Sequence, residues 1–273
     1  MTAHEVADPT GGLGAEQVKA CCATGYSSDL VTLLLGSSYH PGGTTLTRRL
    51  LAAIGLQTGE RLVDVASGIG TTSLLAAQDY GAFVDGVDLS EANVKLASGA
   101  AVAADLADRT RFHHGDAEAL PLPDGSCDAV ICECALCIFP DKATAATEMA
   151  RVLRPGGRVG ISDITADPLR LPAELTGIAA RVACIADARP ATEYRTLLEA
   201  ASLQVTLVEH HTHALDRMIR QIAARLDLLK MIARPRLDEL GVDLTRAGPV
   251  LDAARTAVCD GILDYVLVVA EKP

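Results

Sequence analysis

Short apolar runs alternate with longer amphipathic stretches through most of the chain, and this alternation predicts strands and helices in turn. The apolar runs predict strands over 61–66, 83–88, 111–114, 128–133, 158–163, 204–210 and 264–271. The amphipathic stretches predict helices over 71–80, 91–107, 143–153 and 192–201. Strands and helices that alternate in this way form a mostly parallel sheet with helices on both faces, which is a doubly wound, Rossmann-like α/β fold.

Two regions lie outside this alternation. Residues 27–56 have a helical pattern that the turn-forming run 37–43 interrupts, and we expect residues 1–56 to form an N-terminal cap segment. Residues 215–258 form a second helical region, which we expect to be interrupted at Pro235 and at Gly248 and Pro249. We therefore expect a main domain over 57–273, with a helical insertion over 215–258 that precedes the last strand and covers a pocket.

The bulk composition limits the class of protein and its partners. Hydrophobic residues make up 49% of the 273 positions and charged residues 22%, which is the balance of a globular protein. A formal charge of -11 has the wrong sign for neutralising a track of phosphates, so we expect no nucleic-acid partner. No apolar run approaches the ~20 residues that span a bilayer, and the N-terminus lacks a signal-peptide pattern. We therefore expect a cytoplasmic protein without a membrane partner.

The strongest chemical signal is the turn after the first predicted strand. Residues 62–70 read LVDVASGIG, an apolar strand that runs into small residues and then opens a helix. Ligands of open α/β sheets lie beyond the carboxyl ends of the strands, where glycine lets the backbone approach them closely. The next strand ends at Asp88, about 20 positions later, the separation at which a carboxylate meets ribose hydroxyls. The third strand runs into GDAEALP over 115–121.

These motifs, together with RVLRPGG over 151–157, resemble the class I S-adenosylmethionine-dependent methyltransferases over roughly residues 61–162. The NAD fingerprint G-x-G-x-x-G is not matched, because residues 66–73 read ASGIGTTS and Ala66 stands where a first glycine is usual. The resemblance implies S-adenosylmethionine as cofactor, with Asp88 at the ribose hydroxyls and Asp116 and Ala117 at adenine. The implied cofactor residues are Asp64, Ala66, Ser67, Gly68, Gly70, Asp88, Leu89, Asp116, Ala117 and Glu133.

Cysteines gather beyond the fourth predicted strand, where residues 132–137 read CECALC. Strand alternation would place Cys132 and Cys134 on one face, with Cys137 in the loop beyond. The spacing lacks the paired pattern of a structural zinc site, so we expect no bound metal. Cysteine also packs as a small hydrophobic residue, and this interpretation is favoured for Cys127 and Cys132.

A second resemblance concerns the methyl acceptor. The sequence CALCIFPDK over 134–142, the segment RVACIADA over 181–188 and the N-terminal Ala20-Cys21-Cys22 resemble arsenite methyltransferases. The chain departs from that family at 38–42, which reads SYHPG, and in the 215–258 insertion. The resemblance implies that trivalent arsenic is held as the acceptor by thiolates of Cys21, Cys22, Cys184, Cys134 and Cys137.

Three functions therefore stay open. The first is methylation of arsenite, and the second is C- or O-methylation of a small molecule of the quinone-biosynthesis or natural-product type. The third is a non-catalytic cofactor-binding sensor. A carbon or oxygen acceptor needs a general base, for which His40, Glu133 and His210 are the candidates. The sequence predicts no particular oligomeric state.

Overall fold

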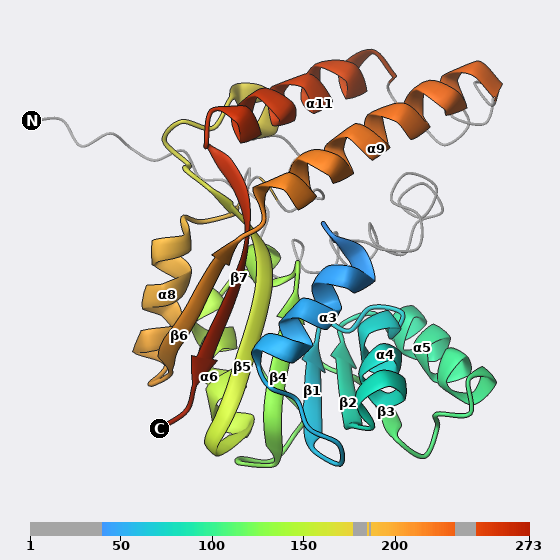
Figure 1. Ribbon diagram of the computed structural model, residues 1–273, viewed down its shortest axis with the longest axis vertical. Helices are drawn as coiled ribbons and strands as arrows, with labels where there is room; N and C mark the ends of the chain where they lie inside the picture. The colour runs from blue at the N-terminus through green and yellow to red at the C-terminus, as the bar shows by residue number, and fades with distance from the viewer. Residues whose placement is uncertain (1–39, 177–184, 186, 233–243) are drawn as a thin grey trace, which may run out of the picture.

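A seven-stranded sheet forms the centre of the molecule, in a computed structural model that describes residues 40–176, 185, 187–232 and 244–273. The strand order is β3-β2-β1-β4-β5-β7-β6 (Figure 1). The strands are β1 (Arg61–Val65), β2 (Phe83–Asp88), β3 (Thr110–His114), β4 (Cys127–Glu133), β5 (Leu153–Ala166), β6 (Gln204–His210) and β7 (Leu263–Glu271). β7 is antiparallel to β5 and β6, and the other strand pairs are parallel. The predicted mostly parallel, Rossmann-like α/β fold is confirmed.

Helices bury both faces of this sheet. On one face, Met149 of α6 (Lys142–Val152) and Leu198 of α8 (Ala191–Ala200) pack with Val130 of β4. On the other face, α3 (Gly43–Ala53) and α4 (Thr71–Tyr80) pack with Ile131 of β4. α5 (Glu91–Ala103) lies against β2 and β3 at the sheet edge. The alternation of Val130 and Ile131 between the two faces follows from the two-residue period of a strand.

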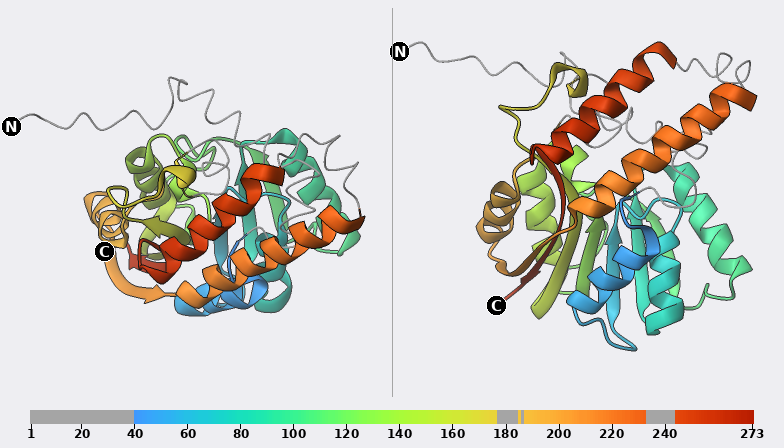
Figure 2. Two further views of the ribbon diagram at one scale, coloured as in Figure 1. Left: turned by 90° about the horizontal axis from the view of Figure 1, so that it is seen from above. Right: turned by 45° about the horizontal axis from the view of Figure 1, so that its top comes forward.

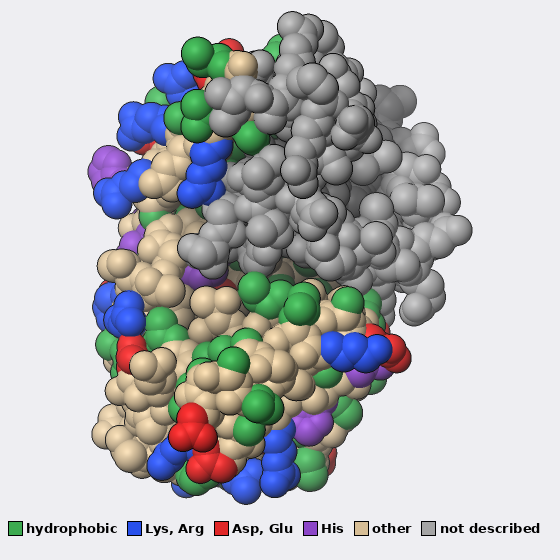
Figure 3. Space-filling view, turned by 90° about the vertical axis from the view of Figure 1, so that its right-hand side faces the viewer, with side chains coloured by type: hydrophobic (Ala, Val, Ile, Leu, Met, Phe, Trp, Pro, Cys, Tyr) green, Lys and Arg blue, Asp and Glu red, His purple; other side chains and the backbone are tan. Residues whose placement is uncertain are grey.

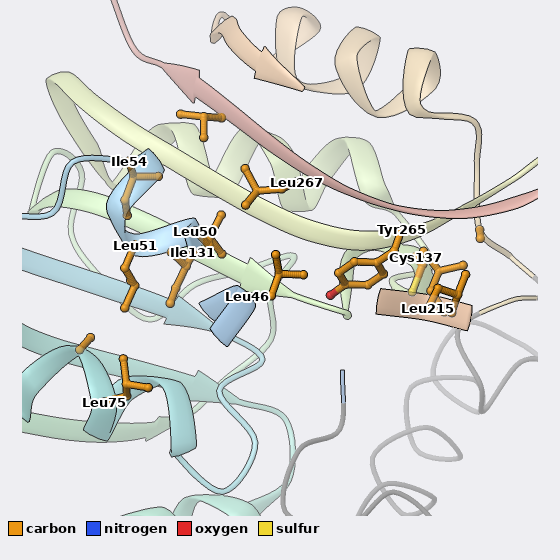
Figure 4. Close-up of a cluster of buried hydrophobic side chains, with 14 of the residues drawn as sticks. Leu46, Leu50, Leu51, Ile54, Leu75, Ile131, Cys137, Leu215, Tyr265 and Leu267 are labelled. Atoms are coloured by element: carbon orange, nitrogen blue, oxygen red, sulfur yellow. The ribbon is translucent and has the colours of Figure 1, made fainter. Parts of the chain in front are cut away.

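α3 is seated against the sheet through a glycine in β5. Leu50 of α3 and Ile54, the residue that directly follows this helix, are buried and point toward the strands, as Figure 4 shows. A Cβ atom at Gly160 would lie 2.7 Å from Ile54 Cγ2 and 2.8 Å from Leu50 Cδ1, so this close approach requires glycine. The packing brings the first turn of α3, with Thr44 and Thr47, to the carboxyl ends of the parallel strands.

The described part of the predicted insertion contains two helices, α9 (Thr212–Ile232) and α11 (Leu244–Cys259), which lie side by side beyond the carboxyl ends of the parallel strands (Figures 1 and 2). The predicted break at Gly248 and Pro249 is wrong, because Pro249 lies inside α11. Pro249 stands early in this helix, where its missing N–H removes a single intrahelical hydrogen bond. Pro235 lies outside the described residues. None of the described helices is long and apolar enough to cross a membrane.

Most predicted boundaries of the strands and helices agree with the structure to within two residues, and three differ more. The helix predicted over 91–107 ends at Ala103, because Asp105 adopts a left-handed φ of 57° that breaks the helix. β5 begins at Leu153, which pairs with Cys127, and it continues to Ala166. On the face in Figure 3, the described hydrophobic side chains are interspersed with charged and polar ones. The division of the chain at residue 56 stays a prediction.

Candidate functional site

A cavity of about 190 Å³ opens at the carboxyl ends of β1, β2 and β4. Its lining also includes the turn after β1, the loop after β3, the start of α4 and residues 138–140, together with His40 and with Thr44 of α3. Of the cofactor residues proposed from the sequence, those that line this cavity are Asp64, Ala66, Ser67, Gly68, Asp88, Leu89, Asp116, Ala117 and Glu133. Residues from four separate segments therefore meet at one place.

Gly70 belongs to the predicted set but serves packing instead of lining the cavity. A Cβ atom at Gly70 would lie 2.8 Å from Phe112 Cζ and 2.9 Å from Ala97 Cβ. Its φ of 83° also lies in the left-handed region, where glycine is favoured. Gly70 thus lets the first turn of α4 fit between β3 and α5.

The turn after β1 has the features of a ligand cradle. The backbone N–H of Gly68 donates a hydrogen bond to Asp88 Oδ2 at 2.8 Å, and a Cβ atom at Gly68 would meet no other atom within 4 Å. Ser67 Oγ is buried and, among the described residues, has no hydrogen-bond partner. Ala66 precedes it with a left-handed φ of 59°. Open space beside a glycine and a buried hydroxyl without a partner fit a bound ligand at this turn.

Asp88 is fixed at the end of β2. Its Oδ1 accepts hydrogen bonds from the backbone N–H of Ser90 at 2.9 Å and from Asn93 Nδ2 at 3.1 Å. The side chain is largely buried, so the carboxylate has one orientation toward the cavity. Asn93 also lines the cavity and was missed from the sequence. The sequence signal that could have identified Asn93 was its position three residues after Ser90, the N-cap of α5.

Asp64 is the most perturbed carboxyl group of the cavity. Its Oδ2 accepts a hydrogen bond from Ser73 Oγ at 2.6 Å. Burial raises the pKa of Asp64 from 3.8 to about 7, the Ser73 hydrogen bond opposes that rise, and the negative charges of Glu133 and Asp88 add to it. A cationic ligand group beside Asp64 would favour the ionised carboxylate.

Glu133 is surrounded by hydroxyl groups at the end of β4. Its carboxylate accepts hydrogen bonds from Thr72 Oγ1 at 2.7 Å, from Thr47 Oγ1 at 3.1 Å and from Ser162 Oγ at 3.3 Å. His40 Nε2 lies 3.3 Å from Thr47 Oγ1 and 3.7 Å from Glu133 Oε2. The hydroxyl residues were missed from the sequence, because they come from α3, α4 and β5 and only the fold brings them together.

Cys134 lines the cavity, but the predicted shared face with Cys132 is wrong. Cys132 packs in the cluster on the α6 face, whereas Cys134 packs against the cluster on the α3 face. The reason is the left-handed φ of 53° at Cys134, which ends the strand alternation after Glu133. Cys137 is fully buried in the short 3-10 helix η1 (Leu136–Ile138) and does not line the cavity.

The remaining candidates lie elsewhere. Cys21, Cys22 and Cys184 lie outside the described residues. His210 is exposed, pairs with Asp264 Oδ2 at 2.6 Å and does not line the cavity. Within the described ranges, no group of three or more His, Cys, Asp or Glu residues is placed to hold a metal ion. Of the three candidate bases, His40 and Glu133 therefore lie at the cavity.

Comparisons with known proteins bear on this site. Residues 63–161 match a family described as a methyltransferase domain. The chain is 31% identical over 267 residues to 27-O-demethylrifamycin SV methyltransferase of Amycolatopsis mediterranei, covering 91% of this chain and 96% of the relative. It is 34% identical to an arsenite methyltransferase of Halobacterium salinarum, over only 54% of this chain and 38% of that relative.

Among solved structures, the [4+2]-cyclase SpnF is similar with a TM-score of 0.74 and 24% identity, covering 96% of this chain and 97% of that chain. This likeness concerns the fold alone. The match to the rifamycin methyltransferase extends over nearly the whole of both chains, so the hypothesis of a non-catalytic sensor is not retained. The chain therefore belongs to the S-adenosylmethionine-dependent methyltransferases and transfers a methyl group to a small molecule.

Proposed function

We propose that this enzyme methylates a hydroxyl group of a natural-product-type small molecule. The observation that carries the proposal is that one cavity brings the proposed cofactor residues together with His40 and with the apolar residues Ile138, Phe139 and Pro140. The full-length similarity to a rifamycin methyltransferase, whose name specifies a 27-O position, supports an oxygen acceptor.

In this proposal the carboxylates bind different parts of the cofactor. Asp88 binds the ribose hydroxyls, and Asp116 and Ala117 contact adenine. Asp64 and Glu133 face the cationic methionine end, where their negative charge is complementary. S-adenosylmethionine, when bound, supplies a sulfonium methyl group that is transferred by in-line displacement.

His40 is the proposed general base. As the acceptor oxygen forms its bond to the methyl carbon and the sulfonium takes back its electron pair, the hydroxyl proton must leave. His40 Nδ1 lies 3.2 Å from the carbonyl oxygen of Pro41, so an Nδ1–H donates there and Nε2 is left to take the proton. Glu133 is less suited, because three hydroxyl groups already donate to it.

The surroundings of His40 stabilise the resulting imidazolium. Once protonated, Nε2 faces Thr47 Oγ1, whose own hydrogen is directed to Glu133. The Glu133 carboxylate, 3.7 Å from Nε2, supplies the opposite charge. Thr47 is therefore a positioning residue between the base and its carboxylate.

The test is incubation of purified protein with labelled methyl donor and separate acceptors, namely hydroquinones, catechols, hydroxylated polyketides and arsenite with excess thiol. We expect methyl ethers by mass spectrometry, and His40→Gln should lower the rate at least ~100-fold while donor affinity stays within about twofold. His113→Gln is the matched control, because His113 pairs with Asp85 at 2.8 Å and does not line the cavity. Absence of any methyl ether from the wild-type protein would refute the proposal.

Arsenite methylation is the second candidate, and Cys134 at the cavity lining is the observation that favours it. Trivalent arsenic needs soft sulfur ligands that converge, so Cys134→Ser and Cys184→Ser should each abolish arsenite methylation while sparing donor binding. If the wild-type protein forms methylated arsenic and both variants do not, arsenite replaces the hydroxyl acceptor in this proposal.

A further inference from the structure

We infer that Lys142 and Asp187 form a latch that positions the cavity wall at residues 138–140 and thereby controls acceptor binding. The inference rests on the proposed function in one respect, because it requires that residues 138–140 contact the methyl acceptor. The latch itself is defined by contacts among described residues. In the part of the chain that the structure describes, the hydrogen bonds of the Lys142 and Asp187 side chains go to Phe139, to each other and to Arg189, none of which is among the cofactor positions proposed above.

The place of Lys142 is unfavourable for the helix that contains it. Lys142 is the first residue of α6 and is only 8% exposed. The N-terminus of a helix carries partial positive charge, and a buried ammonium is costly unless it is paired. Asp141 already caps this helix by accepting a hydrogen bond from the Thr144 N–H at 2.9 Å. The capping of α6 therefore does not explain why Lys142 is buried at this position.

The Lys142 ammonium joins two segments that are distant in the sequence. Its Nζ donates to the carbonyl oxygen of Phe139 at 3.0 Å and to Asp187 Oδ2 at 2.7 Å. Phe139 lines the cavity, with Ile138 and Pro140 on either side. Lys142 thus links the backbone of the cavity wall to the side chain of Asp187, in the segment that precedes α8.

That segment is anchored to the sheet. Asp187 Oδ1 accepts a second hydrogen bond, from Arg189 at 3.1 Å. The backbone of Arg189 accepts from the Ala166 N–H at 3.2 Å, at the end of β5. A displacement of Asp187 would therefore need to break contacts with the sheet, and the fixed end of the latch is the sheet itself.

A second tether holds the other side of the wall. Glu118 Oε1 accepts from the Asp141 N–H at 2.8 Å, and the Glu118 N–H donates to Asp116 Oδ1 at 2.9 Å. Removal of the Glu118 side chain breaks the bond to Asp141 but keeps the backbone N–H that donates to Asp116. Loss of this side chain should therefore loosen the wall beside Asp141 and leave both donor binding and the segment at Asp187 unchanged. Loss of Lys142 should instead loosen both segments.

The experiment compares Lys142→Met, Asp187→Asn and Glu118→Ala with wild type. Lys272→Met is the matched control, because Lys272 Nζ donates to the carbonyl oxygens of Ala150 and Leu153 at the opposite end of α6. The first readout is amide hydrogen exchange over 136–141 and 187–191 in protein without ligand. The others are donor affinity by calorimetry and the KM of whichever acceptor the wild type methylates.

We expect exchange in both segments to rise at least ~10-fold in Lys142→Met and Asp187→Asn, and to stay unchanged in Lys272→Met. In the two latch variants, acceptor KM should rise at least ~5-fold while donor affinity stays within about twofold. Glu118→Ala should raise exchange over 136–141 alone and leave donor affinity within about twofold. Lys142→Arg, which keeps the charge, should retain most of the acceptor affinity of the wild type.

Unchanged exchange in both latch variants would overturn the inference without any reference to catalysis. Raised exchange with an unchanged acceptor KM would overturn the link to acceptor binding. If exchange rises but no hydroxyl acceptor is methylated, the proposed function fails while the latch stands. If Lys142→Met does not fold, Asp187→Asn decides, since asparagine keeps the shape of the side chain.

Discussion

Replacing Asp64 by asparagine should make the ligand-free protein more stable and its donor binding weaker. Asparagine has the same size, can still accept the hydrogen bond from Ser73, and carries no charge. In the wild type, burial raises the pKa of Asp64 from 3.8 to about 7. The native state therefore holds this proton more tightly than the unfolded chain does.

The sign and size of the effect follow from linkage. The contribution of Asp64 to stability is complete below pH ~4, falls as the pH rises to about 7, and is constant above that. The rise of the Asp64 pKa from 3.8 to about 7, at ~1.4 kcal/mol per pH unit, means that the ionised carboxylate lowers the free energy of unfolding by about 4 kcal/mol. Between pH 5 and pH 8 the stability gap between variant and wild type should widen by about 3 kcal/mol.

Urea unfolding of both proteins at pH 5 and pH 8, without ligand, measures this gap. Asp105→Asn, on an exposed turn, is the control, and its difference in stability from wild type should be the same at both pH values. Calorimetry at pH 7 should show proton release when the wild type binds the cationic donor and none for Asp64→Asn, whose affinity should fall at least about tenfold. A gap that is equal at the two pH values would refute the account of Asp64.

Four further substitutions test the cavity and the packing beneath it. Asp88→Ala should lower donor affinity at least about tenfold by calorimetry, because each lost charge-assisted hydrogen bond is worth roughly 1.5–3 kcal/mol; unchanged affinity in a folded variant would move the ribose site elsewhere. Gly68→Val should abolish donor binding by filling the cradle, whereas Ala66→Gly should change stability by no more than about 1 kcal/mol, since it relieves a left-handed alanine at the cost of chain entropy. Normal binding by Gly68→Val would remove the turn from the site. Gly160→Val should lower the free energy of unfolding by about 1–3 kcal/mol in urea titrations through overpacking against α3, and an unaffected stability would contradict that close contact.

The part of the cavity lining that follows β1 and β2 was predictable because its residues are local in sequence. A strand, a turn of small residues and a second strand that ends in Asp88 lie within one βαβ unit, so spacing alone indicates where they meet. Gly70 shows the limit of this reasoning, because a glycine that packs against Phe112 has the same sequence signature as one that faces a ligand.

The acceptor side depends on contacts that no local pattern contains. Glu133 is 86 residues from Thr47, and Lys142 is 45 residues from Asp187, so both arrangements arise only when the sheet is assembled. Cys134 illustrates a different reason. Its left-handed backbone overrides strand alternation, and a non-glycine residue gives little warning of that conformation.

The antiparallel β7 also affects how this protein could change over evolutionary time. Because β6 and β7 are antiparallel neighbours, the segment that connects them leaves and re-enters the sheet at the same end of the strands. The helices α9 and α11 can therefore lengthen, shorten or be exchanged without altering the strand order or the register of β1, β2 and β4. The connection between β6 and β7 could therefore be exchanged as one unit, while the strands that carry the cavity are inherited intact.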